Sequence, residues 1–585
     1  MSETGKMKIA SRTVSVAKRG LAGPACGFLL LLWLSAPAVF GAEIPERVVG
    51  EMKAMIEEGM AAQGIPGVAT TWFDRDEILW SEEFGWTDRS HETRIGPETR
   101  FSAQSTSKLI CALALLHAQE KGLVDLDAPL ARYLPGIAIH SVWQKNPQQA
   151  ITLRQLLNHT SGLPHEARVN NNYSLVSGPF DEHLASIAES WLKFPVGSRQ
   201  SYSNLGYSLA GRVLEVVTGM QFEEYVERNV LVPAGITRGT LRRENALADS
   251  DRALGHSVKF SKVPECPDIP PAGGFYSTTS DLARLSQLVM REGRTSKGRQ
   301  WLRPESVAQL FEMPFASEGQ RFGHGLGLEK KIEGSVEYIL APGRGFGFIG
   351  GVVWVPEANL GMAMLINNQD AVLPYQMLFA FMSYVGEQLP KTVAAARGEG
   401  RAGVSEPPVA DLERVIGEYI GEEARITVTG NEGAYLIDAG DGGGLRPARP
   451  IPGGLVFEAP GRSVRLRFTE DLGTGRPALV DLAAGVAYLA NRVPAKKAST
   501  SSDWKRHEGT YRLRQWGEIV ATHRFEVRDG IAFWDDLTLD ERRTGLFFSP
   551  TGEALDLRGA TPYFSGIELQ FEASAPESSS KGRHL

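Results

Sequence analysis

A lysine stands at the start of a long apolar segment, and this placement limits the folds that the chain can adopt. The segment FSAQSTSKLICALALL covers residues 101–116, and Lys108 follows Ser105 by three positions. The run from Leu109 to Leu116 carries no charge, as in a helix that is buried on all sides. Because an ammonium group against such a helix is costly unless the fold uses it, the segment predicts a buried helix that begins at a functional site.

Ser105 and Lys108 have the spacing of side chains that touch on one face of a helix, since residues i and i+3 lie about one turn apart. A helix N-terminus and an apolar environment both lower the pKa of a lysine, which makes Lys108 usable as a base. A serine hydroxyl becomes a nucleophile when such a base takes its proton. The same spacing also begins at four serines that precede no apolar helix, where chance explains it: Ser15, Ser190, Ser502 and Ser578.

A second polar group precedes another helical stretch, in the segment YSNLGYSLAG. Tyr202 is a candidate acid or base, because a phenol beside a lysine is either held as phenolate or passes a proton on. Asn204 carries an amide that is able to bond both a lysine and a substrate. The alternative for Tyr202 is a half-buried aromatic residue, and the alternative for Asn204 is a helix N-cap.

The length of 585 residues is too great for one ordinary core and predicts about three domains. A hydrophobic content of 42% and a charged content of 22% are typical of a globular protein. The formal net charge is -7, and no basic stripe is present, which argues against a nucleic-acid partner. No Cys/His cluster has metal-binding spacing, so we expect neither a metal nor another cofactor. Cys111 lies in the apolar helix and is predicted to be a buried core residue.

The first 41 residues have the pattern of a secretory signal peptide. Basic residues precede the apolar run CGFLLLLWLSAPAVFGA, which ends in small residues. We assign residues 1–41 to the signal peptide and expect a periplasmic or secreted protein without stable membrane insertion after cleavage. The alternative is an uncleaved anchor, for which the apolar run is short.

The rest of the chain divides by composition. Residues 44–392 alternate helical and strand-like stretches, with strands near both ends, which predicts an antiparallel sheet packed by helices. A Gly/Pro-rich linker is expected at 393–410, and short strands follow it. Three segments recur: GEY as GTY, GGLVF as TGLFF, and VRLRF as IELQF. This weak repeat predicts two all-β barrel-like modules at 411–494 and 504–573, unless generic strand sequences match by chance, and a disordered tail at 574–585.

These features together resemble the penicillin-binding-protein and class C β-lactamase superfamily of serine hydrolases, which includes D-aminopeptidases and β-lactamase-like esterases. The segments that carry the resemblance occur in family order: FSAQSTSK, ITLRQLLNHTSGLP, YSNLGYSLAG, PAGGFYSTTSDLARL and GFGFIGGVVWVPEANLGMAMLINN. The resemblance implies an α/β (α+β) sheet domain beside an all-helical region, with the active site between them. It further implies that Ser105 is acylated, that Lys108 is the base, that Tyr202 is a partner acid or base, and that Asn204 contacts substrate and lysine. The two C-terminal modules resemble, more loosely, the paired barrels of D-aminopeptidases.

The chain departs from this family at the third motif, where a lysine or histidine usually opens a short strand segment that ends in glycine. The corresponding residues are Ala341, Pro342 and Gly343, so the glycine is kept and the cation is absent. Losing a charge-assisted hydrogen bond to a substrate carboxylate costs about 1.5–3 kcal/mol. By the same resemblance the oxyanion is bound by the backbone N–H groups of Ser105 and Arg344, and Pro342 is tolerated if it lies at a sheet edge.

Arg344 or His324 is close enough in sequence to supply a replacement charge, and the alternative is that both are surface or loop residues. If position 341 faces the substrate, Ala341→His should restore a preference for substrates that carry a carboxylate.

Three functions fit this pattern. The first is an exported serine hydrolase that acts on esters, amides or D-amino-acid peptides and has weak or no β-lactamase activity. The second is a catalytically silent relative that binds ligands in the same cleft. The third is a true β-lactamase or D,D-carboxypeptidase that uses another cation. In each case the expected partner is a small molecule or peptide, peptidoglycan-derived fragments included.

Overall fold

A computed structural model describes most of the chain between residues 43 and 573. The described residues are 43–314, 322–333, 336–389, 416–420, 425–431, 434–439, 444–451, 454–459, 462–470, 477–481, 486–490, 502–528 and 531–573. The predictions for the signal peptide at 1–41, the linker at 393–410 and the tail at 574–585 lie outside these residues. Within them, the model contains no helix with the length and hydropathy of a membrane span.

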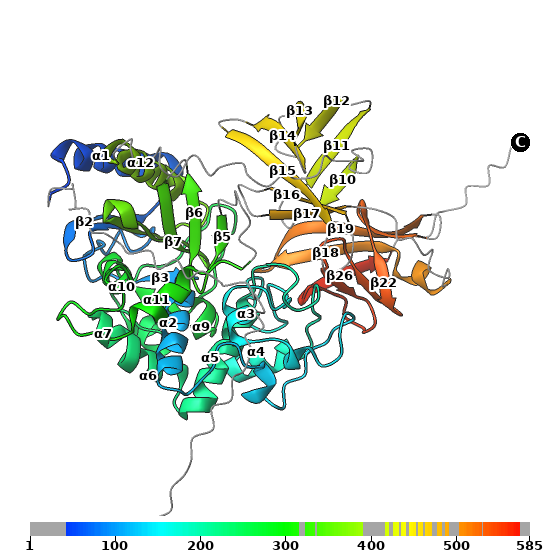
Figure 1. Cartoon of the computed structure of the whole chain (residues 1–585), viewed down its shortest axis with the longest axis horizontal. Coiled ribbons are helices and arrows are strands. Elements are labelled where there is room, and N and C mark those ends of the chain that lie inside the picture. Colours follow the sequence, from blue (N-terminus) through cyan, green and yellow to red (C-terminus); the bar gives the residue numbers. More distant parts are fainter. Residues whose placement is uncertain are drawn as a thin grey trace, which may run out of the picture. The chain divides into compact units, whose positions relative to one another are not determined.

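The first part of the chain is built on an antiparallel sheet of seven strands in the order β2-β1-β9-β8-β7-β6-β5 (Figure 1). The N-terminal hairpin and the late strands are therefore neighbours, because β1 pairs with both β2 and β9. The strands are β1 (Gly67–Phe73), β2 (Ile78–Gly85), β5 (Phe322–His324), β6 (Glu329–Glu333), β7 (Val336–Gly345), β8 (Phe348–Val355) and β9 (Leu360–Ile366).

Both faces of this sheet are covered, which explains why its central strands are apolar on both sides. Trp72 on β1 packs with the helices α1 (Glu46–Gln63) and α12 (Leu373–Gln388) in one core. Phe73, the next residue, lies in the second core with the helical region. Helix α1 ends at Gly64, which has a left-handed φ of 60°, as its sequence predicts.

The helical region lies between the early and late strands in sequence and contains α2 (Ser107–Glu120), which is buried along most of its length. A two-stranded pair, β3 (Phe101–Gln104) with β4 (Phe275–Ser277), leads the chain into α2. The other helices are α3 (Leu153–Leu157), α4 (Phe180–Ile187), α5 (Asn204–Thr218), α6 (Phe222–Val226), α7 (Val232–Ala234), α8 (Arg243–Ala248), α9 (Pro270–Gly273), α10 (Thr279–Met290) and α11 (Pro304–Ala308).

A glycine in the YSNLGYSLAG segment explains how α5 approaches its neighbour. A Cβ added at Gly211 would lie 2.2 Å from Cγ of Pro271, so only glycine lets α5 pack this closely against α9. Lys108 of α2 donates a hydrogen bond to the carbonyl of Ala272 on α9, which ties the same segment to the nucleophile helix. The motif glycines are therefore packing residues that bring polar groups together.

After residue 415 the described chain is β apart from one 3-10 helix, η7 (Ser502–His507), and its first sheet is a closed barrel of eight strands (Figure 1). Its strands are β10 (Gly417–Ile420), β11 (Arg425–Asn431), β12 (Ala434–Asp438), β13 (Leu445–Ile451), β14 (Gly454–Ala459), β15 (Arg462–Glu470), β16 (Pro477–Asp481) and β17 (Val486–Ala490). β10 closes the barrel by pairing with β17 as well as with β11.

The second sheet has nine strands in the order β21-β20-β19-β18-β26-β25-β24-β23-β22. Its two end strands, β21 and β22, are consecutive in sequence with only Leu539 between them, so the sheet curls until its edges nearly meet. Its strands are β18 (Gly509–Gln515), β19 (Glu518–Arg528), β20 (Ile531–Trp534), β21 (Leu537–Thr538), β22 (Asp540–Arg543), β23 (Leu546–Phe548), β24 (Ala554–Asp556), β25 (Tyr563–Phe564) and β26 (Ile567–Ala573).

One of the three repeat matches keeps its place in the two sheets, and the other two do not. GEY and GTY open β10 and β18, the first strands, but GGLVF reaches β14, the fifth strand of the barrel, and TGLFF reaches β23, the sixth strand of the second sheet. VRLRF, however, lies on β15, two strands before the barrel ends, whereas IELQF lies on the last strand, β26. The second and third matches therefore do not mark equivalent strands, because alternating apolar residues occur in any half-buried strand.

Candidate active site

The candidate nucleophile Ser105 lies in the turn between β3 and α2. Gln104 precedes it with φ at 50°, a strained conformation for a residue with a side chain. The hydroxyl of Ser107 bridges this turn, since it donates to the Gln104 carbonyl at 2.6 Å and accepts from the Phe275 backbone N–H at 2.9 Å. The turn is therefore held from both sides and presents Ser105 at the N-terminus of α2.

Lys108 is buried, and three groups share its ammonium. Nζ lies 3.2 Å from Ser105 Oγ, 2.8 Å from Asn204 Oδ1 and 2.7 Å from the Ala272 carbonyl oxygen. Burial lowers the pKa of Lys108 to about 7, and the charge of Glu166 opposes that shift in part. The predicted contact with Ser105 and the predicted lowering of the lysine pKa are both present.

Tyr202 completes the group around the nucleophile. Its hydroxyl donates a 2.9 Å hydrogen bond to Ser105 Oγ, and its ring stacks on His159 with centroids 4.4 Å apart. Burial raises the pKa of Tyr202, although the hydrogen bond to Ser105 opposes the rise. Of the two roles left open by the sequence, these surroundings favour a protonated phenol that donates a proton.

Asn204 is the first residue of α5, and Ser203 is the N-cap, because its side chain accepts from the Gly206 backbone N–H. The N-cap alternative for Asn204 is therefore wrong. The Asn204 amide instead contacts two groups of the site: Oδ1 accepts a hydrogen bond from Lys108, and Nδ2 lies 3.3 Å from Glu166 Oε1. Glu166 is only 3% exposed, and burial raises the pKa of its carboxyl group.

The third-motif residues lie on β7, beside the nucleophile strand. A Cβ added at Gly343 would lie 2.1 Å from the carbonyl oxygen of Ala103 on β3, so only glycine allows this approach. Pairing of β6 with β7 stops at Leu340, and Pro342 therefore needs no hydrogen-bond partner on that side. The sequence predicted an edge strand; β7 is an edge only beyond Leu340, and it lies between β6 and β8 before that residue.

Ala341 does not present its side chain to solvent. It is 2% exposed and its methyl group lies in the core that also contains Leu109 and Leu328. Its carbonyl oxygen accepts a 3.0 Å hydrogen bond from the Thr106 hydroxyl, next to the nucleophile. The expectation that a histidine at position 341 would face the substrate is therefore not supported by the packing.

A histidine from a neighbouring strand lies near Tyr202 instead. His324 on β5 has its ring centroid 5.9 Å from that of Tyr202 and 5.2 Å from that of His159. Its Nδ1 lies 3.9 Å from Oε1 of Glu329, and burial raises the pKa of Glu329 to about 7. Of the two replacement charges considered from sequence, His324 is the one that contacts the catalytic group. Both residues lie on strands rather than in loops, and Arg344 is a surface residue, as the alternative had it.

The structure thus brings Ser105, Lys108, Tyr202 and Asn204 together, and it places Gly343 and Arg344 on the adjacent strand. Sequence reasoning did not identify Glu166, although it follows the motif segment HTSGLP by two residues. The two cysteines remaining beyond residue 41, Cys111 and Cys266, are free and buried. Among the described residues, no three His, Cys, Asp or Glu side chains gather as metal ligands would.

Comparisons with known proteins agree on the family of this domain. The family model described as Beta-lactamase matches residues 52–379. A human protein named beta-lactamase-like 1 is 27% identical over 365 residues, which are 61% of this chain and 71% of that protein. Penicillin-binding protein 4* of Bacillus subtilis is 27% identical over 282 residues, 43% of this chain and 56% of its own length. The chain therefore spans little more than half of some relatives.

Solved structures show the same fold at low sequence identity. The octameric penicillin-binding protein homologue from Pyrococcus abyssi aligns with a TM-score of 0.51 and 21% identity, over 75% of this chain and 99% of its own. SurE aligns with a TM-score of 0.54 and 20% identity, over 76% of this chain and 99% of its own. With more than half of the chain matched by the family model, the protein belongs to the β-lactamase family, within the superfamily of serine β-lactamases and penicillin-binding proteins.

Proposed function

We propose that the protein is an exported serine hydrolase that acts through an acyl-enzyme on ester, amide or D-amino-acid peptide bonds, with weak or no β-lactamase activity. Members of its family are typically serine hydrolases. The observation that carries the proposal is the arrangement at Ser105 Oγ, where Lys108 Nζ at 3.2 Å and the Tyr202 hydroxyl at 2.9 Å converge. A buried lysine with a lowered pKa is a base that is usable near neutral pH.

The proposed reaction starts with neutral Lys108, which takes the hydroxyl proton of Ser105 as Oγ attacks the substrate carbonyl. The oxyanion is stabilised by the backbone N–H groups of Ser105 and Arg344. The tetrahedral intermediate collapses as the Tyr202 phenol protonates the leaving group, and the proton held on Lys108 restores the phenol. Water then attacks the acyl-enzyme with the same groups, and Ser105 regains its proton.

The absence of a cation in the third motif supports the proposal that β-lactamase activity is weak or absent. Ala341 offers only a methyl group, and that methyl is buried. A β-lactam carries its carboxylate close to the scissile bond. In relatives the third-motif cation is expected to pair with this carboxylate, and Ala341 supplies no such charge. Losing such a charge-assisted bond corresponds to about 1.5–3 kcal/mol of binding.

The test is covalent labelling of the purified protein with a neutral fluorophosphonate, followed by intact-mass measurement. We expect one adduct per chain on the native protein and on Ser90→Ala, which removes an exposed serine, and none on Ser105→Ala. Hydrolysis of a short neutral aryl ester should follow the same pattern, and nitrocefin turnover should be far slower. Labelling that persists in Ser105→Ala would reject Ser105 as the nucleophile.

One observation favours a second candidate, a catalytically silent ligand-binding protein, since the cation of the third motif is absent at Ala341. The same experiment separates the two functions. A native protein that neither accepts the fluorophosphonate nor hydrolyses the ester would support silent binding.

Export rests on the signal-peptide pattern of residues 1–41. We expect the mature protein in the periplasmic or extracellular fraction, with an N-terminus near Ala42 by mass spectrometry. A full-length chain in the cytosolic fraction would contradict export.

A further inference from the structure

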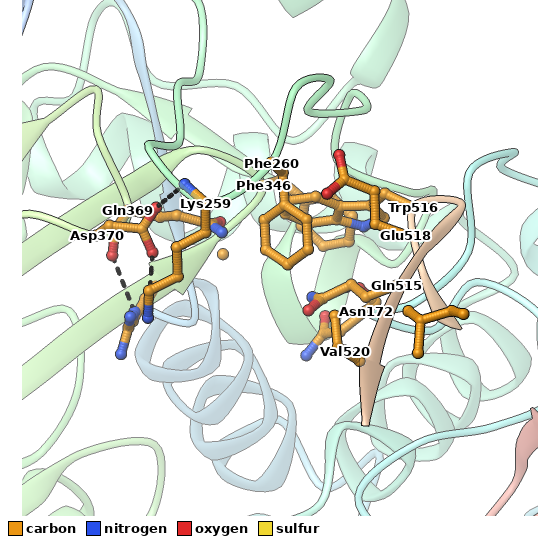
Figure 2. Close-up of a pocket in the computed structure, with 13 residues that line it drawn as sticks. Asn172, Lys259, Phe260, Phe346, Gln369, Asp370, Gln515, Trp516, Glu518 and Val520 are labelled. Carbon is orange, nitrogen blue, oxygen red and sulfur yellow. Dashed lines mark hydrogen bonds and ion pairs between the residues drawn. The ribbon is translucent and has the colours of Figure 1, made fainter. Parts of the chain in front are cut away.

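A cavity lies at the end of β7, the strand next to the nucleophile turn. It encloses about 480 Å³, and the end of β7, the segment around Lys259, Gln369–Asp370 and the turn between β18 and β19 line it (Figure 2). This volume is in the range of small-molecule sites, roughly 300–1,000 Å³. The cavity therefore has room for part of a substrate.

β7 connects the lining of the cavity to the nucleophile turn. Gly345, one of its lining residues, lies so close to Gln104 that an added Cβ would be 3.1 Å from Gln104 Oε1. Gln104 immediately precedes Ser105, and Arg344 supplies a proposed oxyanion N–H from its backbone. The side chain of Arg344 is exposed and lines the cavity. A substrate held at Ser105 thus has this cavity next to it.

The cavity is lined by two cations, Lys259 and Arg344, and two carboxylates, Asp370 and Glu518, and they differ in which of them has hydrogen-bonding groups left for a ligand. The guanidinium of Arg344 is anchored by Nε, which donates to the Gln369 carbonyl oxygen at 3.0 Å, and the described residues give its terminal nitrogens no acidic partner. Asp370 is already occupied by the Ser257 hydroxyl and the Val258 backbone N–H. Lys259 Nζ lies 3.9 Å from Asp370, which it neutralises in part.

Glu518 on the opposite wall is also occupied, because Oε1 accepts from the backbone and the hydroxyl of Ser261 at 3.0 and 2.8 Å. Both carboxylates therefore have donors of their own, and the unpaired end of Arg344 remains available to a ligand. A planar guanidinium with free N–H groups matches the two oxygens of a carboxylate.

The rest of the lining contains three aromatic rings beside Asn172, Gln515, Ile519 and Val520. Phe260 and Phe346 flank Trp516 with ring centroids 4.7 and 5.7 Å from it, and Figure 2 shows the three rings grouped together, apart from Lys259 and Asp370. A ligand that fits both parts has an apolar body and an anionic end.

We infer that this cavity is a subsite for a substrate carboxylate, bound by the Arg344 side chain, with the apolar body of the substrate against Trp516. The inference rests on the proposed hydrolase function and adds a substrate class to it. Arg344 lies three residues beyond Ala341, about 10 Å along an extended strand. A substrate whose carbonyl lies at the Arg344 backbone N–H has to carry its carboxylate at the distance that the Arg344 side chain spans, as an extended ester or peptide with a remote carboxylate can.

Two acetyl esters that differ only in charge test the inference: those of 3-(4-hydroxyphenyl)propanoic acid and of the matching propanamide. We expect the native protein to prefer the carboxylate ester by about 10-fold or more in kcat/KM. The preference should fall to near unity in Arg344→Met, remain in part in Arg344→Lys, and stay native in Lys331→Met, which removes a cation elsewhere in the same sheet. A native ratio of one, or a native ratio retained by Arg344→Met, would overturn the inference.

Equilibrium binding keeps the result independent of turnover. Calorimetry with 3-(4-hydroxyphenyl)propanoate should show binding to the Ser105→Ala protein. Adding Arg344→Met should weaken this binding about 10-fold or more. If the Ser105→Ala protein does not bind the carboxylate, or if Arg344→Met leaves the affinity unchanged, the subsite is rejected. Failure of the hydrolase function is seen separately, as a native protein that hydrolyses neither ester and accepts no fluorophosphonate. Hydrolysis of both esters at equal rates rejects only the carboxylate subsite.

Discussion

Lys108 and Asn204 are joined by a 2.8 Å hydrogen bond that fixes which end of the Asn204 amide faces the ammonium group. The other end of the amide lies 3.3 Å from Glu166, so a neutral side chain separates the lysine from a buried carboxyl group. The charge of Glu166 raises the pKa of Lys108 against the larger lowering by burial. The base of the proposed reaction is thus adjusted by a carboxyl group that does not touch the nucleophile.

Glu166→Gln should move the acidic limb of the kcat/KM profile to lower pH. The charge of Glu166 opposes part of the lowering by burial, so without it the pKa of Lys108 falls further and the neutral base persists at lower pH. Because burial also raises the pKa of Glu166 to about 8, this carboxyl group is only partly ionised near the limb and the expected shift is small. The profile should be measured with a neutral ester, with Glu92→Gln as a control at an exposed position. A limb that moves upward or stays in place would mean that Glu166 does not act on Lys108.

Lys108→Met should stabilise the fold at pH 6 more than at pH 10. The pKa of Lys108 is about 7 in the folded chain against an ordinary value of 10.5, so between these values the unfolded chain binds a proton that the folded chain does not. The contribution of Lys108 to stability therefore rises with pH across this window. Urea unfolding at both pH values checks the difference, and an equal effect at the two values would contradict a depressed lysine pKa.

Ala341→His should lower the free energy of unfolding by about 1–3 kcal/mol, because a larger side chain overpacks a site that is 2% exposed. Denaturant unfolding measures the loss, and Ala341→Ser, which adds a single oxygen, is the matched small substitution. If the histidine variant kept native stability and gained activity on carboxylate esters, position 341 would open onto the cleft after all.

Trp516→Asn should destabilise the contact between the last β-sheet and the catalytic domain. Trp516 and Gly517 form the two-residue turn between β18 and β19 with φ of 51° and 89°, a turn for which Asn-Gly is preferred. The substitution therefore improves the turn and removes only the packing of the indole on Phe260 and Phe346. Faster proteolysis of this variant than of Trp516→Phe is expected; unchanged resistance would show that the indole packing contributes little.

Lys193→Met should cost about 1–3 kcal/mol, because it removes the ion pair between a buried lysine and Glu553, whose side chain is 19% exposed. Lys193 is 2% exposed, pairs with Glu553 between β23 and β24, and donates to the Ser201 hydroxyl. Adding Glu553→Gln should recover part of the loss, as thermal unfolding of the four proteins in the double-mutant cycle would show. Strictly additive losses would mean that the two residues are not coupled.

The sequence by itself determined the local chemistry and most elements. Ser105 and Lys108 had to meet because the helix repeat places i and i+3 on one face, and Gly64 had to end the first helix because glycine adopts a left-handed conformation freely. The β-rich character of the C-terminal part was also readable from alternating apolar residues and turn signals.

Only the tertiary structure decided which distant groups surround the nucleophile. The carbonyl of Ala272, which bonds Lys108 across 164 positions in the chain, and the carboxyl group of Glu166 have no local signal, because their role depends on how α2, α5 and α9 pack. Trp516 likewise reads as an ordinary aromatic residue until its turn is seen against Phe346. Spacing along one helix is fixed by backbone geometry, whereas contacts between segments are fixed by burial of the whole core.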